Sequence, residues 1–323
     1  MAKNYKKISS NIEKLIIDNP TTPKEYLTWI NIKNARKKEI EYLRKKYNFN
    51  LSHLQASSVK ASSQRPMIEK MNDYIFLIIH FPVLENDHVT VSEIEFFIGK
   101  DYLITLYNDN IPAIKELFKL CQKDSESSLS FLFESSAILL YEILEKLMSG
   151  TYILLDEVSI KIYELEELIF SQNSKTAASQ ILYLRRNIIH MRKIMQNHKN
   201  IIKKLTDIEI GLAPEENVKK YYFQLLDHSK RIWENLENQR DMIEVLNSTN
   251  DAFLNYRISD IMKTLTIFSV IVFPLTLLAA IFGMNTVNGM PFINTENGFW
   301  IIIVIMLTGC LGMLFFFERK KWL

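Results

Sequence analysis

Several side chains near the end of the sequence offer neutral oxygen atoms within a largely apolar stretch. Ser269, Thr276 and Asn285 lie in residues 262–285, which contain no Asp, Glu, His or Cys. A transition metal that is ligated directly normally requires such ligands. Mg2+ holds its waters tightly, and neutral oxygens can hydrogen-bond to those waters without removing them. The residue types therefore favour contact with a hydrated divalent cation over catalysis.

These oxygens belong to one stripe of a predicted helix. The stripe recurs every three or four positions and consists of Met262, Leu265, Ser269, Phe273 (or Val272), Thr276, Ala280 and Gly283. In a symmetric ring of chains it would line an axial path, in which Met262 and Leu265 form a hydrophobic constriction that gates by dewetting. Small and hydroxyl-bearing residues are also common where membrane helices pack, so helix packing is the alternative interpretation.

The stripe ends at Gly283-Met284-Asn285, where the predicted helix reaches its C-terminus. Unpaired carbonyl groups and the helix macrodipole make such an end attractive to cations. We expect Gly283 to allow a close approach and an unusual backbone conformation. Repeated around an axis, the Asn285 amide oxygens and the Gly283 carbonyls would form a ring that holds hydrated Mg2+ through its waters.

Two segments near the C-terminus are long and apolar enough to cross a membrane as helices. Residues 264–282 and 299–317 each comprise 19 residues without a charge, close to the length that about 30 Å of hydrocarbon requires. From Glu215 the sequence has no Gly or Pro until Pro274, which predicts one helix of roughly 100 Å that continues into the first span. So long a helix needs partner helices, which indicates a bundle of several copies of the chain.

The charges that flank the two spans predict their orientation. Arg257 and Lys263 precede the first span, basic residues 319–321 follow the second, and the loop 286–298 contains no Lys or Arg. By the positive-inside rule, both termini of this multi-pass protein face the cytoplasm, and lipid of the cytoplasmic membrane surrounds the spans. The loop has one acid, Glu296, which would concentrate cations at the mouth or is simply solvated.

The polar first part of the chain is predicted to form a cytoplasmic α/β domain followed by helices. Short β-branched and aromatic runs predict strands at YLTWINI, YIFLIIHF, VTVSEIEFFIG and YLITLY, with a tight turn at Gly99-Lys100-Asp101. Apolar residues at three- and four-residue spacing predict helices over residues 35–47, 112–122, 127–148, 151–171 and 176–206. The predicted fold class is therefore an α+β membrane protein.

The predicted domain organisation has seven consecutive parts. They are an α/β domain at 1–150, antiparallel helices at 151–214, a stalk helix at 215–263, the first span at 264–285, an extracellular loop at 286–298, the second span at 299–318 and a basic tail at 319–323. The first two parts and the stalk are expected in the cytoplasm, because the N-terminus lacks the apolar core of a signal peptide.

Other patterns in the sequence argue against several classes of function. A net charge of +2 gives no basic excess for binding nucleic acid. The two cysteines form no CxxC pair, and His190 and His198 lie on a basic segment without a carboxylate partner, so neither pattern predicts a metal site. The sequence has no phosphate-binding Gly-rich loop and no nucleophile–base motif, so we expect no enzymatic activity, no ATP-driven pumping and no organic cofactor.

The residues around the first span resemble a known family. Its markers here are Met262-Lys263-x-Leu265-Thr266, Pro274-Leu275-Thr276, Phe282-Gly283-Met284-Asn285 and Lys320-Lys321-Trp322-Leu323, with Gln64-Arg65-Pro66 and residues 221–228 in the first part of the chain. This pattern is similar to the CorA family of divalent cation transporters, members of the GMN-motif superfamily. The resemblance extends over the whole chain.

The resemblance implies a homopentamer with a cytoplasmic α/β funnel, a stalk helix that continues into a pore-lining first span, and an outer ring of second spans. It implies Mg2+ as the transported ion and a selectivity filter at Gly283, Met284 and Asn285. The pore would begin at Ser259, where the family usually has Asn. The partners are then other copies of the chain, membrane lipid and the divalent cation.

The sequence also departs from the family pattern. Members that sense magnesium carry carboxylates between neighbouring cytoplasmic domains and along the stalk. The matching positions here are all neutral: Ser58, Gln224 and Ser248. Asp227 and Asp251 lie nearby and would substitute only after a shift in register. In the outer loop Phe292 stands where the family often has an acid.

Two other functions stay open from the sequence. A CorA-like transporter of Zn2+, Co2+ or Ni2+ would fit the neutral sensor positions and the altered loop. A membrane-anchored helical scaffold or signal transducer without a pore would use Ser269 and Thr276 as packing contacts. Magnesium transport through a filter at Asn285 is the prediction that the residues favour.

Overall fold

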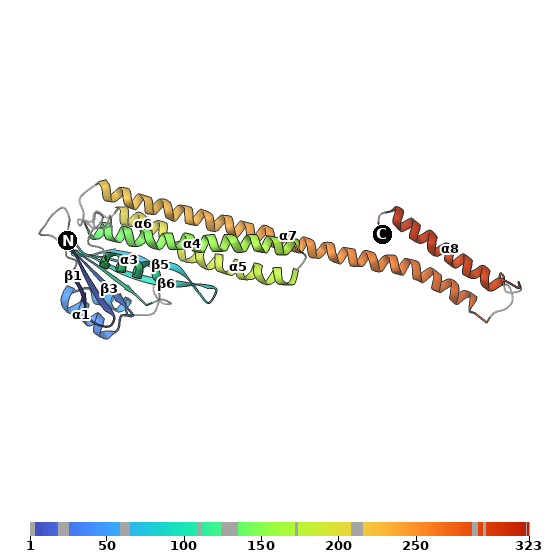
Figure 1. Cartoon of the computed structure of the whole chain (residues 1–323), viewed down its shortest axis with the longest axis horizontal. Helices are drawn as coiled ribbons and strands as arrows, with labels where there is room; N and C mark the ends of the chain where they lie inside the picture. Colours follow the sequence, from blue (N-terminus) through green and yellow to red (C-terminus); the bar gives the residue numbers. More distant parts are fainter. Residues whose placement is uncertain are drawn as a thin grey trace. The chain divides into compact units, whose positions relative to one another are not determined.

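A computed structural model describes most of the chain. It describes residues 4–18, 26–58, 65–108, 111–123, 135–171, 174–207, 216–285, 290–292, 295–320 and 322. The chain forms two compact units, residues 1–247 and 248–323. Figure 1 shows the elements coloured along the sequence.

The first unit contains a seven-stranded mixed sheet. Its strands are β1 (Asn4–Lys7), β2 (Ile12–Asp18), β3 (Tyr26–Lys33), β4 (Met67–Lys70), β5 (Ile75–Glu85), β6 (His88–Ile98) and β7 (Tyr102–Tyr107). They lie in the order β1-β2-β3-β7-β6-β5-β4. Every neighbouring pair is antiparallel except the parallel pair β3–β7. The predicted turn at residues 99–101 connects β6 to its antiparallel neighbour β7.

The predicted strands correspond to β3, β5, β6 and β7, whereas β1, β2 and β4 are missing from the prediction. β1 and β4 have four residues each and form the two edges of the sheet. Edge strands are often short and charged, so NYKK and MIEK carry little strand signal. In β2 the apolar positions Ile12, Leu15 and Ile17 are buried, but charged residues interrupt them.

Two hydrophobic cores cover the two faces of the sheet. The larger includes Trp29, Leu77 and Phe96 and is shared with α3 (Pro112–Lys123), α4 (Ser136–Phe170) and α5 (Ser174–Met195). The smaller includes Phe76 and Phe97 and is shared with α1 (Lys37–Tyr47) and α2 (Leu51–Ala56). Successive strand residues point to opposite faces, so β5, covered on both, is apolar at every position from Ile75 to Ile79.

The helices of the first unit differ from the prediction in two places: two predicted helices form one, and one predicted helix forms two. The predicted segments 127–148 and 151–171 form the single helix α4, although residues 127–134 lie outside the described part. Gly150 lies within this helix, because packing of its flanks into the larger core outweighs the roughly 1 kcal/mol that glycine costs a helix. The predicted boundary at residue 150 thus falls inside α4. The predicted helix 176–206 is instead two, α5 and α6 (His198–Asp207), separated at residues 196–197.

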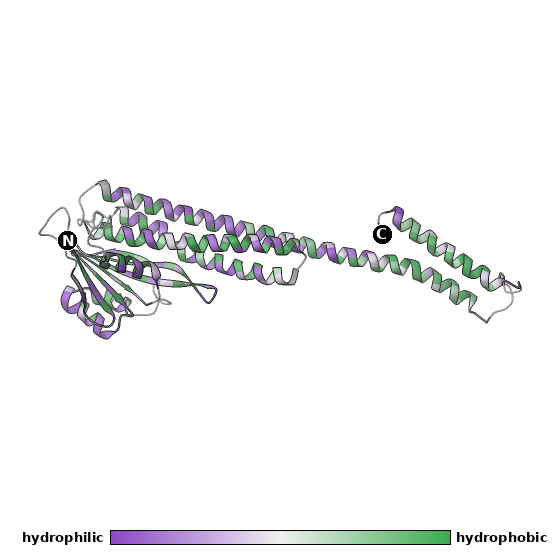
Figure 2. Ribbon diagram, in the orientation of Figure 1, coloured by the Kyte–Doolittle hydropathy of each residue, from purple (hydrophilic) through white to green (hydrophobic). Residues whose placement is uncertain are grey.

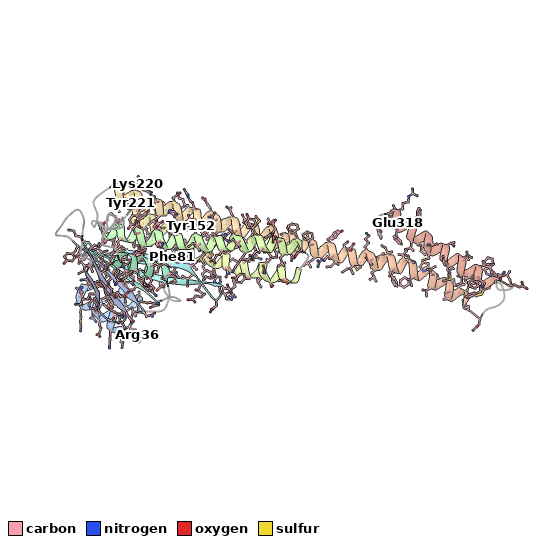
Figure 3. All side chains as sticks on the ribbon, in the orientation of Figure 1. Arg36, Phe81, Tyr152, Lys220, Tyr221 and Glu318 are labelled. Atoms are coloured by element: carbon pink, nitrogen blue, oxygen red, sulfur yellow. The ribbon has the colours of Figure 1, made fainter. Side chains whose placement is uncertain are left out.

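The long predicted helix is present as α7 (Glu216–Phe282), which has 67 residues. In the first unit it packs on α4 through polar contacts as well as apolar ones. The Tyr222 hydroxyl donates to the Ala137 carbonyl at 2.8 Å, and the Gln239 amide donates to the Leu155 carbonyl at 2.8 Å. Figure 3 labels Tyr152 on α4, whose hydroxyl donates to the His228 carbonyl at 3.3 Å.

The second unit consists of the last part of α7, from Ser248, and α8 (Gly298–Arg319). Both helices contain stretches that are long and apolar enough to cross a membrane. Figure 2 shows the apolar colouring that dominates both helices here. The two predicted spans therefore correspond to helices, and their apolar side chains are largely exposed.

Candidate functional site

The predicted stripe lies on the exposed side of α7. In the second unit, one side of the helix is buried or half-buried, at Ile267, Ile271, Leu275, Leu278 and Phe282. At about 100° per residue, the stripe is centred on the opposite side. Of its members, Ser269 is half-buried and the others are exposed: Met262, Leu265, Phe273, Thr276 and Ala280. Ser259, one turn before Met262, is also exposed, whereas Val272, the alternative to Phe273, is half-buried.

The hydroxyl groups of Ser269 and Thr276 donate hydrogen bonds to backbone carbonyls of α7 itself. The Ser269 hydroxyl donates to the Leu265 carbonyl, and the Thr276 hydroxyl donates to the Val272 carbonyl, both at 2.8 Å. A hydroxyl has one hydrogen to donate and two lone pairs that accept. Each oxygen therefore keeps acceptor capacity after its hydrogen is used. Such a surface can accept hydrogen bonds from the waters around a cation.

Pro274 lies within the stripe segment without ending the helix, since α7 continues to Phe282. It removes the donor that would otherwise bond the Val270 carbonyl. Leu265, Ser269 and Phe273 line a shallow hollow on α7 together with Thr266, Val270 and Pro274. The polar and apolar members of the stripe thus border one surface depression.

Gly283 continues the hydrogen bonding of α7 beyond its last helical residue. Its amide donates to the Ala279 carbonyl at 2.9 Å, and the Met284 amide donates to the Ile281 carbonyl at 3.2 Å. The backbone at Gly283 is not left-handed, so the expectation of an unusual conformation is wrong. A Cβ atom there would lie 3.1 Å from the Ala279 carbonyl oxygen, so a side chain at this position would fit only after a small shift of that carbonyl. Gly283, Met284 and Asn285 are all exposed.

The segment between the two helices contains a tight turn that the sequence does not predict. Phe292 has a φ of 70°, which side chains other than glycine rarely adopt. Its carbonyl accepts hydrogen bonds from Thr295, at 2.7 Å from the hydroxyl. A Cβ atom on Gly298 would lie 2.0 Å from that carbonyl oxygen, so only glycine fits. Glu296 is exposed in this turn, and residues 286–289 and 293–294 of the predicted loop lie outside the described part.

Comparison with known proteins assigns the chain to a family. The family model described as CorA-like Mg2+ transporter protein matches residues 24–320, which is most of the chain and includes both apolar helices and the Gly283-Met284-Asn285 segment. The chain belongs to the CorA family. It is therefore a CorA-like divalent cation transporter of a membrane, with transport and not catalysis as the family activity.

Relatives of the CorA family match along nearly all of the chain. The putative metal ion transporter YfjQ of Bacillus subtilis is 24% identical over 91% of this chain and 89% of its own length. The cobalt/magnesium transport protein CorA of Thermotoga maritima is 25% identical over 92% of this chain and 83% of its own. The structure of the CorA magnesium transporter from Methanocaldococcus jannaschii superposes with a TM-score of 0.81 at 21% identity, covering 99% of this chain and 98% of that one. The fold is thus that of a full-length CorA protein.

The neutral sensor positions of this CorA protein serve local structure where their contacts are described. The Ser58 hydroxyl donates to the Gln55 carbonyl at 2.8 Å at the end of α2. The Gln224 amide oxygen accepts from the Tyr141 hydroxyl at 3.0 Å. Asp227, the nearby acid, forms an exposed ion pair with Arg231 at 2.8 Å. Gln224 thus bonds to a neighbouring helix of its own chain.

Among the described residues of this CorA protein, no group of three or more His, Cys, Asp or Glu side chains could hold a metal ion. His198 is fully buried on α6 and bonds to the His80 carbonyl, whereas His190 is exposed on α5. Sequence reasoning missed the helical hydrogen bonds of Ser269 and Thr276. The signal was available, because serine and threonine hydroxyls within helices commonly bond to the carbonyl four residues earlier.

Proposed function

We propose that this CorA protein conducts hydrated Mg2+ across the cytoplasmic membrane through a pentameric pore lined by the α7 stripe. The single observation that carries the proposal is the uncovered stripe of α7, on which two hydroxyl oxygens retain acceptor capacity. Five copies of the stripe around an axis would surround an ion with acceptors for its water hydrogens. Mg2+ dehydrates reluctantly, so a path that binds its waters suits it.

In this proposal Gly283, Met284 and Asn285 form the selectivity filter at the outer end of α7. The Asn285 side chain is exposed directly after the last turn of the helix. Carbonyl groups at a helix C-terminus attract cations, which adds to the effect of the amide oxygens. Met262 and Leu265 would form the hydrophobic constriction, with Ser259 at the cytoplasmic mouth and Glu296 at the outer mouth.

The charge distribution supports an orientation with both termini in the cytoplasm. Basic residues flank the cytoplasmic ends of both spans, and the loop between them has none. A doubly charged ion that enters a cell with a negative interior gains about 4.6 kcal/mol per 100 mV. The membrane potential therefore suffices to drive Mg2+ inward without another energy source.

A second candidate is transport of another divalent cation by the same pore. The relative from Bacillus subtilis is named only as a putative metal ion transporter, and the name of the Thermotoga maritima relative includes both cobalt and magnesium. The stripe and Asn285 offer only neutral oxygens for any of these ions. Zn2+, Co2+ and Ni2+ would then pass as hydrated ions too.

The test is ion uptake into proteoliposomes with an imposed negative interior potential. We expect Mg2+ uptake by the unaltered chain and a loss of at least about tenfold in Asn285→Ala, because the variant lacks a hydrogen-bonding group at every subunit of the ring. Asn297→Ala is the matched control, since Asn297 is also exposed in this segment and makes no side-chain capping bond.

Unchanged Mg2+ uptake by Asn285→Ala would contradict the filter assignment. Uptake of Co2+ or Zn2+ without Mg2+ would favour the second candidate. Absence of uptake for every ion would instead favour a non-conducting scaffold or signal transducer. Rescue of a bacterial strain that needs high external magnesium is the corresponding test in cells.

A further inference from the structure

A cavity of about 220 Å³ lies in the first unit, far along the sequence from the α7 stripe. Residues of β2, β3 and β7 line one side of it, and α3 lines the other. On the sheet side, Glu13 pairs with Asn31 in register, and Lys33 pairs with Tyr107. On the helix side, Lys115, Phe118, Lys119 and Gln122 recur with the spacing of one helix face. Most of its lining residues have polar side chains, although its surface is about equally polar and apolar, and two of these residues, Asn31 and Tyr107, are buried.

The floor of this cavity is the end of a directional chain of hydrogen bonds. Trp29 starts it, because an indole N–H can only donate, and it donates to the Thr105 hydroxyl at 3.3 Å. The Thr105 hydroxyl donates to the Asn31 amide oxygen at 2.8 Å, and the Asn31 amide nitrogen donates to the Tyr107 hydroxyl at 3.2 Å. The Thr105 hydroxyl and the Asn31 amide therefore each accept from one neighbour and donate to the next.

Tyr107 is the last residue of this hydrogen-bond series and lines the cavity, and among the described residues its hydroxyl hydrogen has no assigned acceptor. Tyr107 is only 4% exposed, and Asn31 is 5% exposed. Burial raises the pKa of Tyr107, an effect that the hydrogen bond from Asn31 opposes, and the hydroxyl keeps its proton at neutral pH. Asn31 also has a second amide hydrogen, since only one is used by Tyr107. Asn31 and Tyr107, which both line the cavity, thus each keep one hydrogen that a ligand could accept.

The charges around the cavity complement those donors. Lys33, Lys115 and Lys119 line it together with one acid, Glu13, one of whose oxygens already accepts from the Tyr5 hydroxyl at 3.0 Å. Within the described ranges, no ion pair joins any of the three lysines to an acid. Donors at the floor and an excess of ammonium groups at the walls favour a ligand with negative charge and several acceptor oxygens.

We propose that this cavity binds a small oxyanion, a phosphate-bearing or carboxylate-bearing molecule, with the Tyr107 hydroxyl and the Asn31 amide at the floor and Lys33, Lys115 and Lys119 around it. The volume is smaller than that of sites for drug-sized ligands, which limits the occupant to a small molecule. Phosphate and carboxylate groups share the required chemistry, so the choice between them is made by experiment.

The test is isothermal titration calorimetry on the full-length oligomer in detergent without Mg2+, using inorganic phosphate, pyrophosphate and citrate as separate probes. We expect saturable binding of at least one probe, with one site per chain. Tyr107→Phe keeps the ring but removes the donor, and the double variant Lys115→Gln/Lys119→Gln removes two charges without touching the core. Each is expected to weaken binding about tenfold, because hydrogen bonds to charged groups are strong.

Matched controls separate a site from general attraction. Tyr26→Phe removes an exposed hydroxyl from β3, and Lys38→Gln removes an exposed charge from α1; neither residue lines the cavity. Both controls should leave the affinity unchanged. No saturable binding of any probe at millimolar concentration would overturn the proposal. Equal weakening by Lys38→Gln and the double lysine variant, or intact binding in well-folded Tyr107→Phe, would overturn it as well.

Discussion

Phe76 and Phe273 are the same residue type in the two units of the chain, with opposite surroundings. Phe76 is fully buried between the sheet and the short helices of the first unit, whereas Phe273 is 70% exposed on α7. The contrast extends to other residues: the first unit buries its apolar side chains in two cores, and the second exposes most of them. A surface so rich in apolar groups is expected only where lipid or other chains replace water.

The two units of the chain are therefore stabilised by different physical effects. The first unit gains stability from apolar area removed from water within the chain itself. Lipid is as apolar as the side chains of the second unit, so burial from water does not drive its helices together. Substitutions of the same type should therefore have very different effects on stability in the two units.

The largest contrast is expected for Phe76→Ala and Phe273→Ala. Removing a buried phenylalanine costs about 3–5 kcal/mol, since it loses transfer energy and leaves a cavity. Phe273→Ala should change the free energy of unfolding by less than about 0.5 kcal/mol, as is usual for exposed positions. Urea unfolding of the full chain in detergent measures both. Equal losses would show that Phe273 is packed against protein and not exposed.

The next largest effect is acid destabilisation of the first unit through His198. Burial lowers the pKa of His198 to about 4, from an ordinary value of 6.5. The unfolded chain then binds a proton between these values while the folded chain does not. The stabilising contribution is complete above about pH 6.5 and is lost as pH falls toward about 4, by roughly 3 kcal/mol in total.

Urea unfolding at a series of pH values measures this dependence. The variant His198→Gln should reduce its slope between about pH 6.5 and 4, because no proton is then taken up at this position. The exposed His190 provides the control variant His190→Gln, which should retain the slope. An unchanged slope in His198→Gln would assign the acid sensitivity to another group.

A smaller contrast is expected for two threonines. Thr105→Val leaves the buried Trp29 indole N–H and the Asn31 amide oxygen without their hydroxyl partner, which costs about 1–3 kcal/mol. Thr276→Val removes an exposed hydroxyl that bonds only within its own helix, so the stability should change by less than about 0.5 kcal/mol. Its expected effect is instead a several-fold fall in Mg2+ uptake. Thr308→Val, which removes a similar hydroxyl from α8, should leave uptake unchanged.

The smallest effect is expected at the ion pair between Asp227 and Arg231. Both side chains are more than half exposed, and such pairs contribute about 0–1 kcal/mol. A double-mutant cycle with Asp227→Asn and Arg231→Gln should give a coupling energy in that range, reduced by salt. A coupling that instead appears only with millimolar Mg2+ would indicate that Asp227 contributes to an ion site between chains.

Much of the fold follows from local patterns in the sequence. The two apolar spans, the long helix α7 and four of the strands have strong periodic or compositional signals. The edge strands β1 and β4 have none, because they are short and charged. The continuity of α4 through Gly150 depends on packing against distant residues, which a local pattern does not contain.

Some features of the candidate sites follow from the sequence, whereas others depend on contacts between residues that the sequence does not reveal. The stripe on α7 requires only helical spacing, so its residues share one face as predicted. The left-handed Phe292 opposite Gly298 arises from contacts within the turn and gives no sequence signal. The hydrogen-bond chain from Trp29 to Tyr107 depends on the register of β3 with β7, which are distant in sequence.

The helical hydrogen bonds of Ser269 and Thr276 also affect how fast ions would move through the proposed pore. Each hydroxyl is restricted to one rotamer before an ion arrives, so it has little side-chain entropy left to lose. A passing hydrated ion would then meet acceptors that need not rotate, at every subunit and every step. Such a lining would bind and release successive hydrated ions without an ordering penalty, which would favour rapid conduction over tight retention.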